Sequence, residues 1–566
     1  MSAVLLVPLL PLLAALMVSA GGEASQRTRA MLAAVPIGTA FVGAVGTLYL
    51  VATQGPITIR FYDPASLASL AFPIGFYVDR LSAVMMVLIS AVGTIIYTYS
   101  LRYMYQEAHE FRYLALIGVT TFVLLCLVSS ANLMMLFLLW QVLSYLLYLL
   151  IHNHTHAGTL ESAFRMFAIL RIGDVAFLAG LALAHSLYGT LEFHELFERA
   201  AASTATVSLL PGIDLDGTTA VTLLLFIGGM SKSAQFPLFV WLPRYLYAPT
   251  PVTALLHAGI INAGGFLINR LAPLFGLSPT TLHIAFAIGT LTAILGATMM
   301  LTQSDIKNQL GFSTIGQMGY MIMECGLGAF SLAVFHLIAH GLFKATMFLN
   351  SGNVIQKARQ EPHFPHADHE EEERSFSRLT WTTGFATTLF IPLVILLVTH
   401  GLLRIPLLES QGTVIFLFFI WVTSSQAILT LTRLRQVESW KVSVAMLVTL
   451  LFVVFIYLFA VESFTAFLYP DPEEVASYFK AAALPSWLFE LMVVFATVLT
   501  GLGWAYLYLR AHGQTMRMPV WIEAMRLRLY VLFMHRLYAD QAYERLGRTA
   551  IQFLNRFDKR AQGRVP

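Results

Sequence analysis

Residues 218–243 read TTAVTLLLFIGGMSKSAQFPLFVWLP, a stretch of 26 residues in which Lys232 is the only charged side chain. Its length exceeds the roughly 20 residues that a helix needs to cross the hydrocarbon of a bilayer. Gly228 and Gly229 precede the lysine and Pro237 follows it, so we expect the helix to break there. A desolvated lysine can take up and release a proton, and ionisable groups in mid-span usually line an ion path. The stretch therefore predicts a broken membrane helix with a proton-carrying lysine.

The whole chain has the composition of a membrane protein. It contains 566 residues, of which 57% are hydrophobic and 11% charged, whereas soluble domains carry about 25% charged residues. Helices satisfy their own backbone groups in lipid, so we predict an all-α integral membrane protein with about 15 transmembrane helices. The expected spans are residues 2–20, 31–54, 79–101, 113–130, 132–151, 163–187, 218–243, 250–273, 281–303, 309–327, 328–350, 379–403, 412–433, 441–461 and 484–510.

Charged residues divide the loops between these spans into two sets. The basic set contains Arg27, Arg29, Arg102, Arg112, Arg244, Lys307, Lys357, Arg359, Arg433, Arg435 and Lys441. The opposite set includes two acidic loops, at 192–216 and 462–474. The positive-inside rule then predicts an outside N-terminus and a cytoplasmic C-terminus in a bacterial inner membrane. Residues 520–557 mix apolar and arginine residues, so we expect an amphipathic helix on the cytoplasmic face.

Two features that might suggest other protein classes have simpler interpretations. The apolar run 2–20 lacks the basic residues that precede the core of a secretory signal, so we expect it to be the first span. Cys126 and Cys325 lie in separate apolar runs, which indicates neither a disulfide framework nor a metal site. We therefore expect no cofactor in this chain.

A second group of ionisable residues stands in the spans that follow Lys232. His336, His340 and Lys344 occur at positions i, i+4 and i+8, which places them on one helix face. This stripe predicts a hydrated polar axis. His257 stands in the span before, where it could join the axis or only hydrogen-bond a neighbouring helix.

Arg171 and Asp174 share a face of the span 163–187 and are expected to form an orienting salt bridge. Lys232 has an alternative interpretation of this kind, as a structural ion-pair partner rather than a proton carrier.

Three segments make a resemblance to a known family visible. They are KSAQFPL at 232–238 continuing to PTPVTALLHA at 249–258, DIK at 305–307 with STIGQMGY at 313–320, and HLIAHGLFKA at 336–345 with FLNSG at 348–352. Together they resemble the antiporter-like subunits of respiratory complex I and of the Mrp cation/proton antiporters, above all the large L-type subunit.

This resemblance implies a role for each candidate residue. It makes Lys232 the channel lysine of a broken helix and places Lys307 on the ion path. It assigns His257, His336, His340 and Lys344 to the central polar axis. It gives Arg171, Asp174 and Asp305 orienting roles. It also implies two inverted repeats at 113–243 and 244–403, preceded by N-terminal helices at 1–112 and followed by C-terminal helices at 404–510 and a basic cytoplasmic segment at 511–566.

The chain departs from the family at two places. Trp140-Gln141 stands where the family has Trp-Glu, so an amide replaces the carboxylate partner of the lysine. A Gly-Phe-x-Ser-Lys-Asp motif is missing near 391–401, which leaves His400 as the nearest titratable group. These departures resemble a shorter branch of the family, the DabB-like subunits of inorganic-carbon accumulation complexes.

A DabB-like subunit pairs with a large zinc-containing DabA subunit that resembles a β-carbonic anhydrase, so zinc is expected in the partner. Cation flow through the membrane subunit then drives hydration of CO2 to bicarbonate by the partner. Two other hypotheses stay open at the level of the sequence. The chain could be a proton/cation antiporter subunit of a complex I or Mrp assembly, or a membrane anchor whose ion path is inactive.

Overall fold

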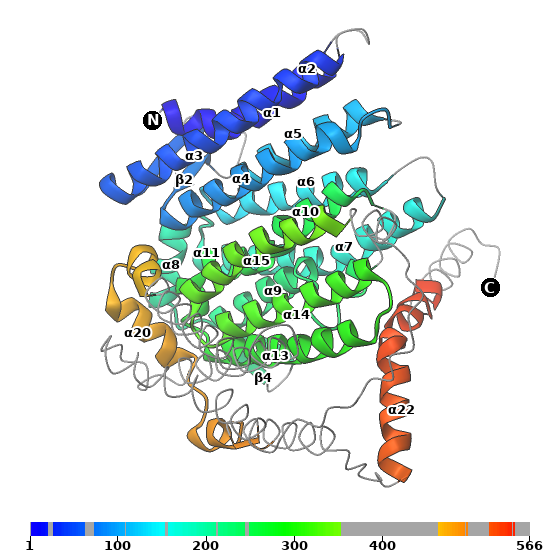
Figure 1. Ribbon diagram of the computed structural model, residues 1–566. Helices are drawn as coiled ribbons and strands as arrows, with labels where there is room; N and C mark the ends of the chain where they lie inside the picture. The colour runs from blue at the N-terminus through cyan, green and yellow to red at the C-terminus, as the bar shows by residue number, and fades with distance from the viewer. Residues whose placement is uncertain are drawn as a thin grey trace, which may run out of the picture.

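The computed structural model describes most of the first two thirds of the chain and part of its C-terminal region. The described residues are 2–20, 26–62, 73–107, 109–152, 157–210, 213–243, 248–351, 462–492, 494–495, 498, 520–545 and 547–549. Figure 1 shows the helices of residues 2–351 running side by side in one bundle. The predicted spans 379–403, 412–433 and 441–461, most of 484–510, and His400 lie outside the described residues.

Each predicted span before residue 351 contains at least one helix. The unbroken helices are α1 (Ser2–Ser19), α3 (Ala34–Gln54, preceded by α2, Gln26–Leu32), α4 (Arg80–Tyr103), α5 (Glu110–Val128), α6 (Leu133–Ile151), α7 (Ala157–Tyr188), α13 (Pro279–Thr302), α14 (Ile306–Gly326) and α15 (Phe330–Ser351). Among the described residues, eight helices are long and apolar enough to cross a membrane. The predicted all-α membrane architecture is confirmed.

Two spans are broken, and both breaks lie in the middle of the bundle. Helix α9 (Gly217–Lys232) ends at the lysine itself, and Ser233 caps it. The next span is divided into α10 (Thr250–Ala258), a 3-10 turn at Ile260–Asn262 and α11 (Ala263–Arg270). The break predicted at Lys232 is therefore confirmed, and it exposes backbone polar groups inside the protein, where only a cavity or protein partners can satisfy them.

Helices α13 and α14 pack so closely that their backbones touch through glycine. A Cβ atom at Gly319 would collide with the backbone of Ala293, and one at Gly296 would collide with the backbone of Gly316. Small residues allow this approach, which dispersion forces favour between helices in lipid. Helix α14 is therefore fixed against α13 through its glycines, while Gln317 and Glu324 on another of its faces contact His336 of α15.

The end of the bundle at which α4 begins carries small elements that the hydropathy pattern does not predict. They are the hairpin β1 (Ile57–Tyr62) with β2 (Ile74–Val78), the helix α8 (Phe193–Ala202), the hairpin β3 (Thr206–Leu210) with β4 (Ile213–Asp216), and the helix α20 (Pro472–Ala481). Both hairpins are antiparallel, with Ile57 opposite Val78 and Thr206 opposite Asp216. The predicted acidic loops are thus folded elements at this end.

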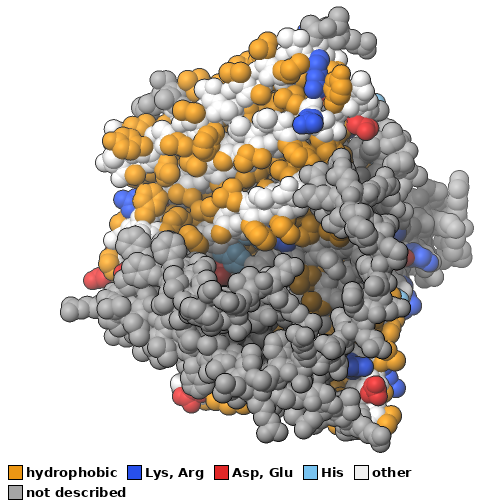
Figure 2. All heavy atoms as spheres, viewed as in Figure 1, with side chains coloured by type: hydrophobic (Ala, Val, Ile, Leu, Met, Phe, Trp, Pro, Cys, Tyr) orange, Lys and Arg blue, Asp and Glu red, His pale blue; other side chains and the backbone are white. Residues whose placement is uncertain are grey.

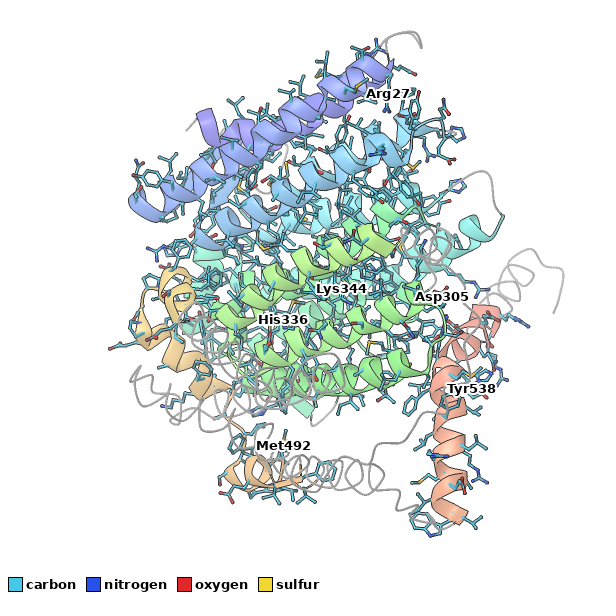
Figure 3. All side chains as sticks on the ribbon, viewed as in Figure 1. Arg27, Asp305, His336, Lys344, Met492 and Tyr538 are labelled. Atoms are coloured by element: carbon cyan, nitrogen blue, oxygen red, sulfur yellow. The ribbon has the colours of Figure 1, made fainter. Side chains whose placement is uncertain are left out.

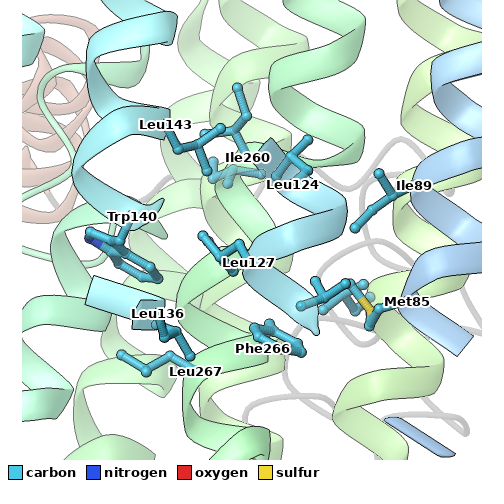
Figure 4. Packing of buried hydrophobic residues seen from close by; sticks show 14 of the residues in the cluster. Met85, Ile89, Leu124, Leu127, Leu136, Trp140, Leu143, Ile260, Phe266 and Leu267 are labelled. Atoms are coloured by element: carbon cyan, nitrogen blue, oxygen red, sulfur yellow. The ribbon is translucent and has the colours of Figure 1, made fainter. Parts of the chain in front are cut away.

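The interior and the outer surface are both apolar, as a membrane protein requires. Figure 4 shows Trp140, Leu136 and Leu267 packed together inside the bundle. On the outside, Val42 is 68% exposed, Tyr49 70% and Leu301 78%. Figure 2 shows hydrophobic side chains covering the face of the upper helices, with charged ones near the helix ends. Lipid is the solvent for such a surface.

The sequence predicts an amphipathic helix over 520–557. The structure instead has a shorter helix, α22 (Val520–Met534), whose apolar side chains do not gather on one face, and a 3-10 turn at Arg536–Tyr538 follows it. In Figure 1, α22 reaches away from the bundle and its C-terminal end meets the bundle. Three contacts hold the residues that follow it. Arg536 donates to Asn308 Oδ1 at 3.2 Å, the Tyr543 hydroxyl donates to the Pro237 carbonyl at 3.2 Å, and Glu544 pairs with Arg165 at 2.7 Å.

Candidate ion-translocation site

Lys232 lies completely buried where α9 stops. Its Nζ donates to the backbone carbonyl of Trp140 on α6 at 2.6 Å and lies 4.1 Å from the centre of the Trp140 ring. A cation over the face of tryptophan is stabilised by the ring quadrupole, and most strongly where water is excluded. The protein thus holds a lysine in mid-bundle, and no carboxylate of the described residues forms an ion pair with it.

One acidic group is linked to Lys232 through Trp140. Asp174 on α7 is buried, and its Oδ1 accepts a hydrogen bond from Trp140 Nε1 at 2.9 Å. Its Oδ2 forms an ion pair with Arg171 Nη2 at 2.6 Å, so the predicted Arg171–Asp174 salt bridge is confirmed. Gln141 Oε1 accepts from Arg171 Nη1. The structure therefore brings Lys232, Trp140, Asp174, Arg171 and Gln141 into one network.

Gln141 does not contact Lys232 in this network, so its influence on the lysine passes through Arg171 and Trp140. For Gln141→Glu we expect slower turnover, because added negative charge favours the protonated lysine. Arg171 screens that charge, so the loss should be tenfold at most, about 1.4 kcal/mol of barrier. The measurement is ion movement against pH by the protein in reconstituted membranes, with Gln141→Leu as the uncharged control. An unchanged profile would mean that position 141 is not coupled to Lys232.

A second group of titratable residues lies on α10 and α15. His257 is buried and stacks on Phe348, with ring centres 4.3 Å apart. Lys344 is buried and donates to Ser313 Oγ at 2.8 Å. Both nitrogens of the buried His340 and Nδ1 of His257 have no hydrogen-bond partner among the described residues. Buried polar atoms are nearly always hydrogen-bonded, so these nitrogens call for water or another partner beyond the described residues.

Lys344 also borders an open pocket of about 550 Å³. Its polar lining comes from Gln309, Ser313, Lys344, Asn350 and Ser351. The pocket lies where α13 ends and α14 begins, so it connects the lysine with one end of the bundle.

Two predicted residues lie outside these networks. Asp305 caps α14 by accepting from the Asn308 backbone N–H at 2.8 Å, which is a structural role. Lys307 lies in the first turn of α14 and donates to the Ala248 carbonyl at 3.4 Å. Figure 3 shows Asp305 at the end of the bundle, with Lys344 and then His336 further along α15.

The sequence interpretation missed two charged groups in the bundle. Glu324 on α14 contacts His336 Nδ1, and both carboxylate oxygens are 3.1 Å away. Arg270 at the end of α11 pairs with Asp79 at the start of α4. A search for every carboxylate and guanidinium inside the predicted spans would have found Glu324 and Arg270, because single charges leave the mean hydropathy of a span almost unchanged.

The fold and these networks are those of an antiporter-like membrane subunit. Comparison with known proteins agrees: residues 130–435 match the family described as "NADH:quinone oxidoreductase/Mrp antiporter, TM", and residues 65–114 match the "NADH-Ubiquinone oxidoreductase (complex I), chain 5 N-terminus". The chain belongs to the NADH:quinone oxidoreductase/Mrp antiporter family.

Within that family, one relative is similar along its whole length. The "Probable inorganic carbon transporter subunit DabB1" of Halothiobacillus neapolitanus is 37% identical over 564 residues, which is 98% of both chains. NADH-quinone oxidoreductase subunit L of Neisseria meningitidis is 33% identical over 68% of this chain and 58% of its own length. A chain in the structure of the Mrp complex from Dietzia sp. covers 100% of this chain with a TM-score of 0.53 at 19% identity, which supports the fold.

Proposed function

We propose that this chain is the proton- or cation-translocating membrane subunit of an inorganic-carbon accumulation complex. In this proposal it energises a zinc-containing, DabA-like partner that hydrates CO2 to bicarbonate. The end-to-end similarity to an inorganic carbon transporter subunit carries the proposal, because the L-subunit relative aligns with only 68% of the chain.

The geometry supports an active ion path over a passive anchor. Lys232 and Lys344 are both buried, and the buried His257 and His340 have nitrogens without a hydrogen-bond partner among the described residues. Intramembrane charges are costly, so a protein that served only as an anchor would gain stability by replacing them with leucine.

The proposal also states which end of the bundle faces the cytoplasm and which subunit carries out the carbon chemistry. The C-terminal segment with Arg526, Arg528 and Arg536 belongs in the cytoplasm, and the end with the hairpins and α8 outside. Residues 113–243 and 244–403 act as the two antiporter-like repeats. Carbon chemistry belongs to the partner, which holds the zinc.

A proton/cation antiporter subunit of a complex I or Mrp assembly is the second candidate. The family match and the fold shared with an Mrp complex favour it. The two candidates differ in what the assembled complex does, so an assay of carbon uptake distinguishes them.

Co-expression in a host that lacks carbonic anhydrase tests the first candidate. We expect this chain together with its zinc-containing partner to restore growth in ambient air, because internal bicarbonate no longer depends on the missing enzyme. A protonophore should stop carbon uptake without removing either protein. The control is the partner expressed alone, and rescue by the partner alone would remove the coupling role.

A further inference from the structure

Glu324 is a carboxylate near the end of α14, and neither the sequence motifs nor the Lys232 network account for it. Its side chain is 13% exposed, and that of His336 is 17% exposed. Both carboxylate oxygens lie 3.1 Å from His336 Nδ1, and Gln317 Oε1 lies 2.9 Å from His336 Nε2. Both ring nitrogens thus face oxygen atoms, an arrangement that a protonated imidazole satisfies because it donates from both nitrogens.

Two more titratable side chains follow His336 along α15, toward the opposite end of the bundle. His340 follows His336 by four residues, about 6 Å of helix rise, and their ring centres are 6.3 Å apart. Both nitrogens of His340 are buried without a hydrogen-bond partner among the described residues, so they remain available to exchange protons with water or with another group. Lys344 lies one turn further, bonded to Ser313 and open to the pocket at Asn350 and Ser351.

We propose that α14 and α15 form a proton path of their own, which runs from Glu324 through His336 and His340 to Lys344 and its pocket. Glu324 is its acidic terminus. A proton bound by Glu324 moves to His336 as another leaves Lys344 for water in the pocket, and each group then regains its original state. One proton crosses and no other reactant is consumed.

The path is separate from the Lys232 network, whose contacts are with α6 and α7. Glu324 gives this path an acid that can exchange protons beside the histidines, which an amide could not do because it does not titrate. This inference rests on the proposed function, since it assumes that the assembled complex moves protons.

The test uses the complete complex, purified with its partner and reconstituted into liposomes that contain a pH-sensitive dye. A potassium diffusion potential drives proton entry. Glu324→Gln keeps the size of the side chain and an oxygen acceptor for His336, but it cannot carry a proton. We expect proton entry to fall at least tenfold in this variant and to be partly retained in Glu324→Asp.

Glu195→Gln is the matched control, because Glu195 lies on α8 with its side chain 49% exposed, and flux should not change. Wild-type flux in Glu324→Gln would overturn the path, and so would a flux that needs sodium. If wild-type complex itself moves no protons, the proposed function fails instead.

A measurement on the unaltered complex keeps the proposal testable even if Glu324→Gln fails to assemble. Dicyclohexylcarbodiimide reacts with protonated carboxyl groups in membranes. We expect mass spectrometry to find the adduct on Glu324 in proportion to the loss of proton entry. Modification of Glu324 without loss of flux, or flux inhibition with Glu324 unmodified, would overturn the path.

Discussion

Lys232→Met is expected to abolish protonophore-sensitive carbon uptake, with a loss of at least about a hundredfold, or ~2.7 kcal/mol. Methionine fills nearly the same buried volume as lysine but cannot take up a proton. The Trp140 carbonyl loses its donor and the Trp140 ring loses its cation, while Asp174 keeps its bonds to Trp140 and Arg171. The measurement is uptake of labelled inorganic carbon by cells that contain equal amounts of the complex.

Lys480→Met provides the matched control for this experiment. Lys480 lies on the surface of α20, far along the chain from the Lys232 network, so its loss should leave uptake unchanged. Full uptake by Lys232→Met at normal complex levels would show that Lys232 is a structural residue.

Asp79→Ala is expected to cause the largest loss of stability, about 3–5 kcal/mol, because it leaves a buried guanidinium without its carboxylate. The two Asp79 oxygens accept from Arg270 at 2.6 and 3.1 Å, and the Arg270 side chain is 4% exposed. Asp79 also caps α4 by accepting from the Ser82 backbone N–H at 2.8 Å. One side chain thus joins the start of α4 to the end of α11. Thermal unfolding of the purified complex measures the loss.

Asp471→Ala separates the contribution of a helix cap from that of the ion pair with Arg270. Asp471 is exposed and caps α20 by accepting from the Glu473 backbone N–H at 3.0 Å, without an arginine partner among the described residues. We expect only the cost of a cap there, about 1 kcal/mol. Equal losses for Asp79→Ala and Asp471→Ala would mean that the Arg270 pair adds nothing.

The ion pair between Asp79 and Arg270 also makes the free energy of unfolding depend on pH under acidic conditions. Burial alone would raise the pKa of the Asp79 carboxyl, but the Arg270 charge and the hydrogen bonds from Arg270 and Ser82 hold this pKa below its ordinary value. The stabilisation is therefore complete above the unfolded pKa, about 4, and is lost as the pH falls below it toward the lower folded value. Asp79→Ala should abolish this part of the acid sensitivity.

The sequence predicts what hydropathy and spacing control. Long apolar runs located the long helices of the bundle up to α15, and the glycines and proline around Lys232 located the break at the end of α9. The spacing of His336, His340 and Lys344 placed them on one face of α15, since the helix repeat fixes that geometry.

The contacts that sequence reasoning missed join residues that are distant in the chain or hidden in an apolar run. Asp79 and Arg270 are 191 residues apart, and no local pattern links them. Gln141 contacts Arg171 rather than Lys232. The amino group of Lys232 is bound instead by the carbonyl oxygen and the ring of Trp140. The hairpins are too short to give a periodic signal.

The contacts of Arg536, Tyr543 and Glu544 couple the segment that follows α22 mechanically to the broken span at Lys232. Tyr543 holds the carbonyl of Pro237, five residues after Lys232, while Glu544 holds α7 and Arg536 holds the first turn of α14. A force that displaced this segment would pull on the loop beside Lys232 and on both helices at once. A fusion protein or purification tag that strains residues 536–544 should therefore impair ion movement even where it leaves the membrane helices intact.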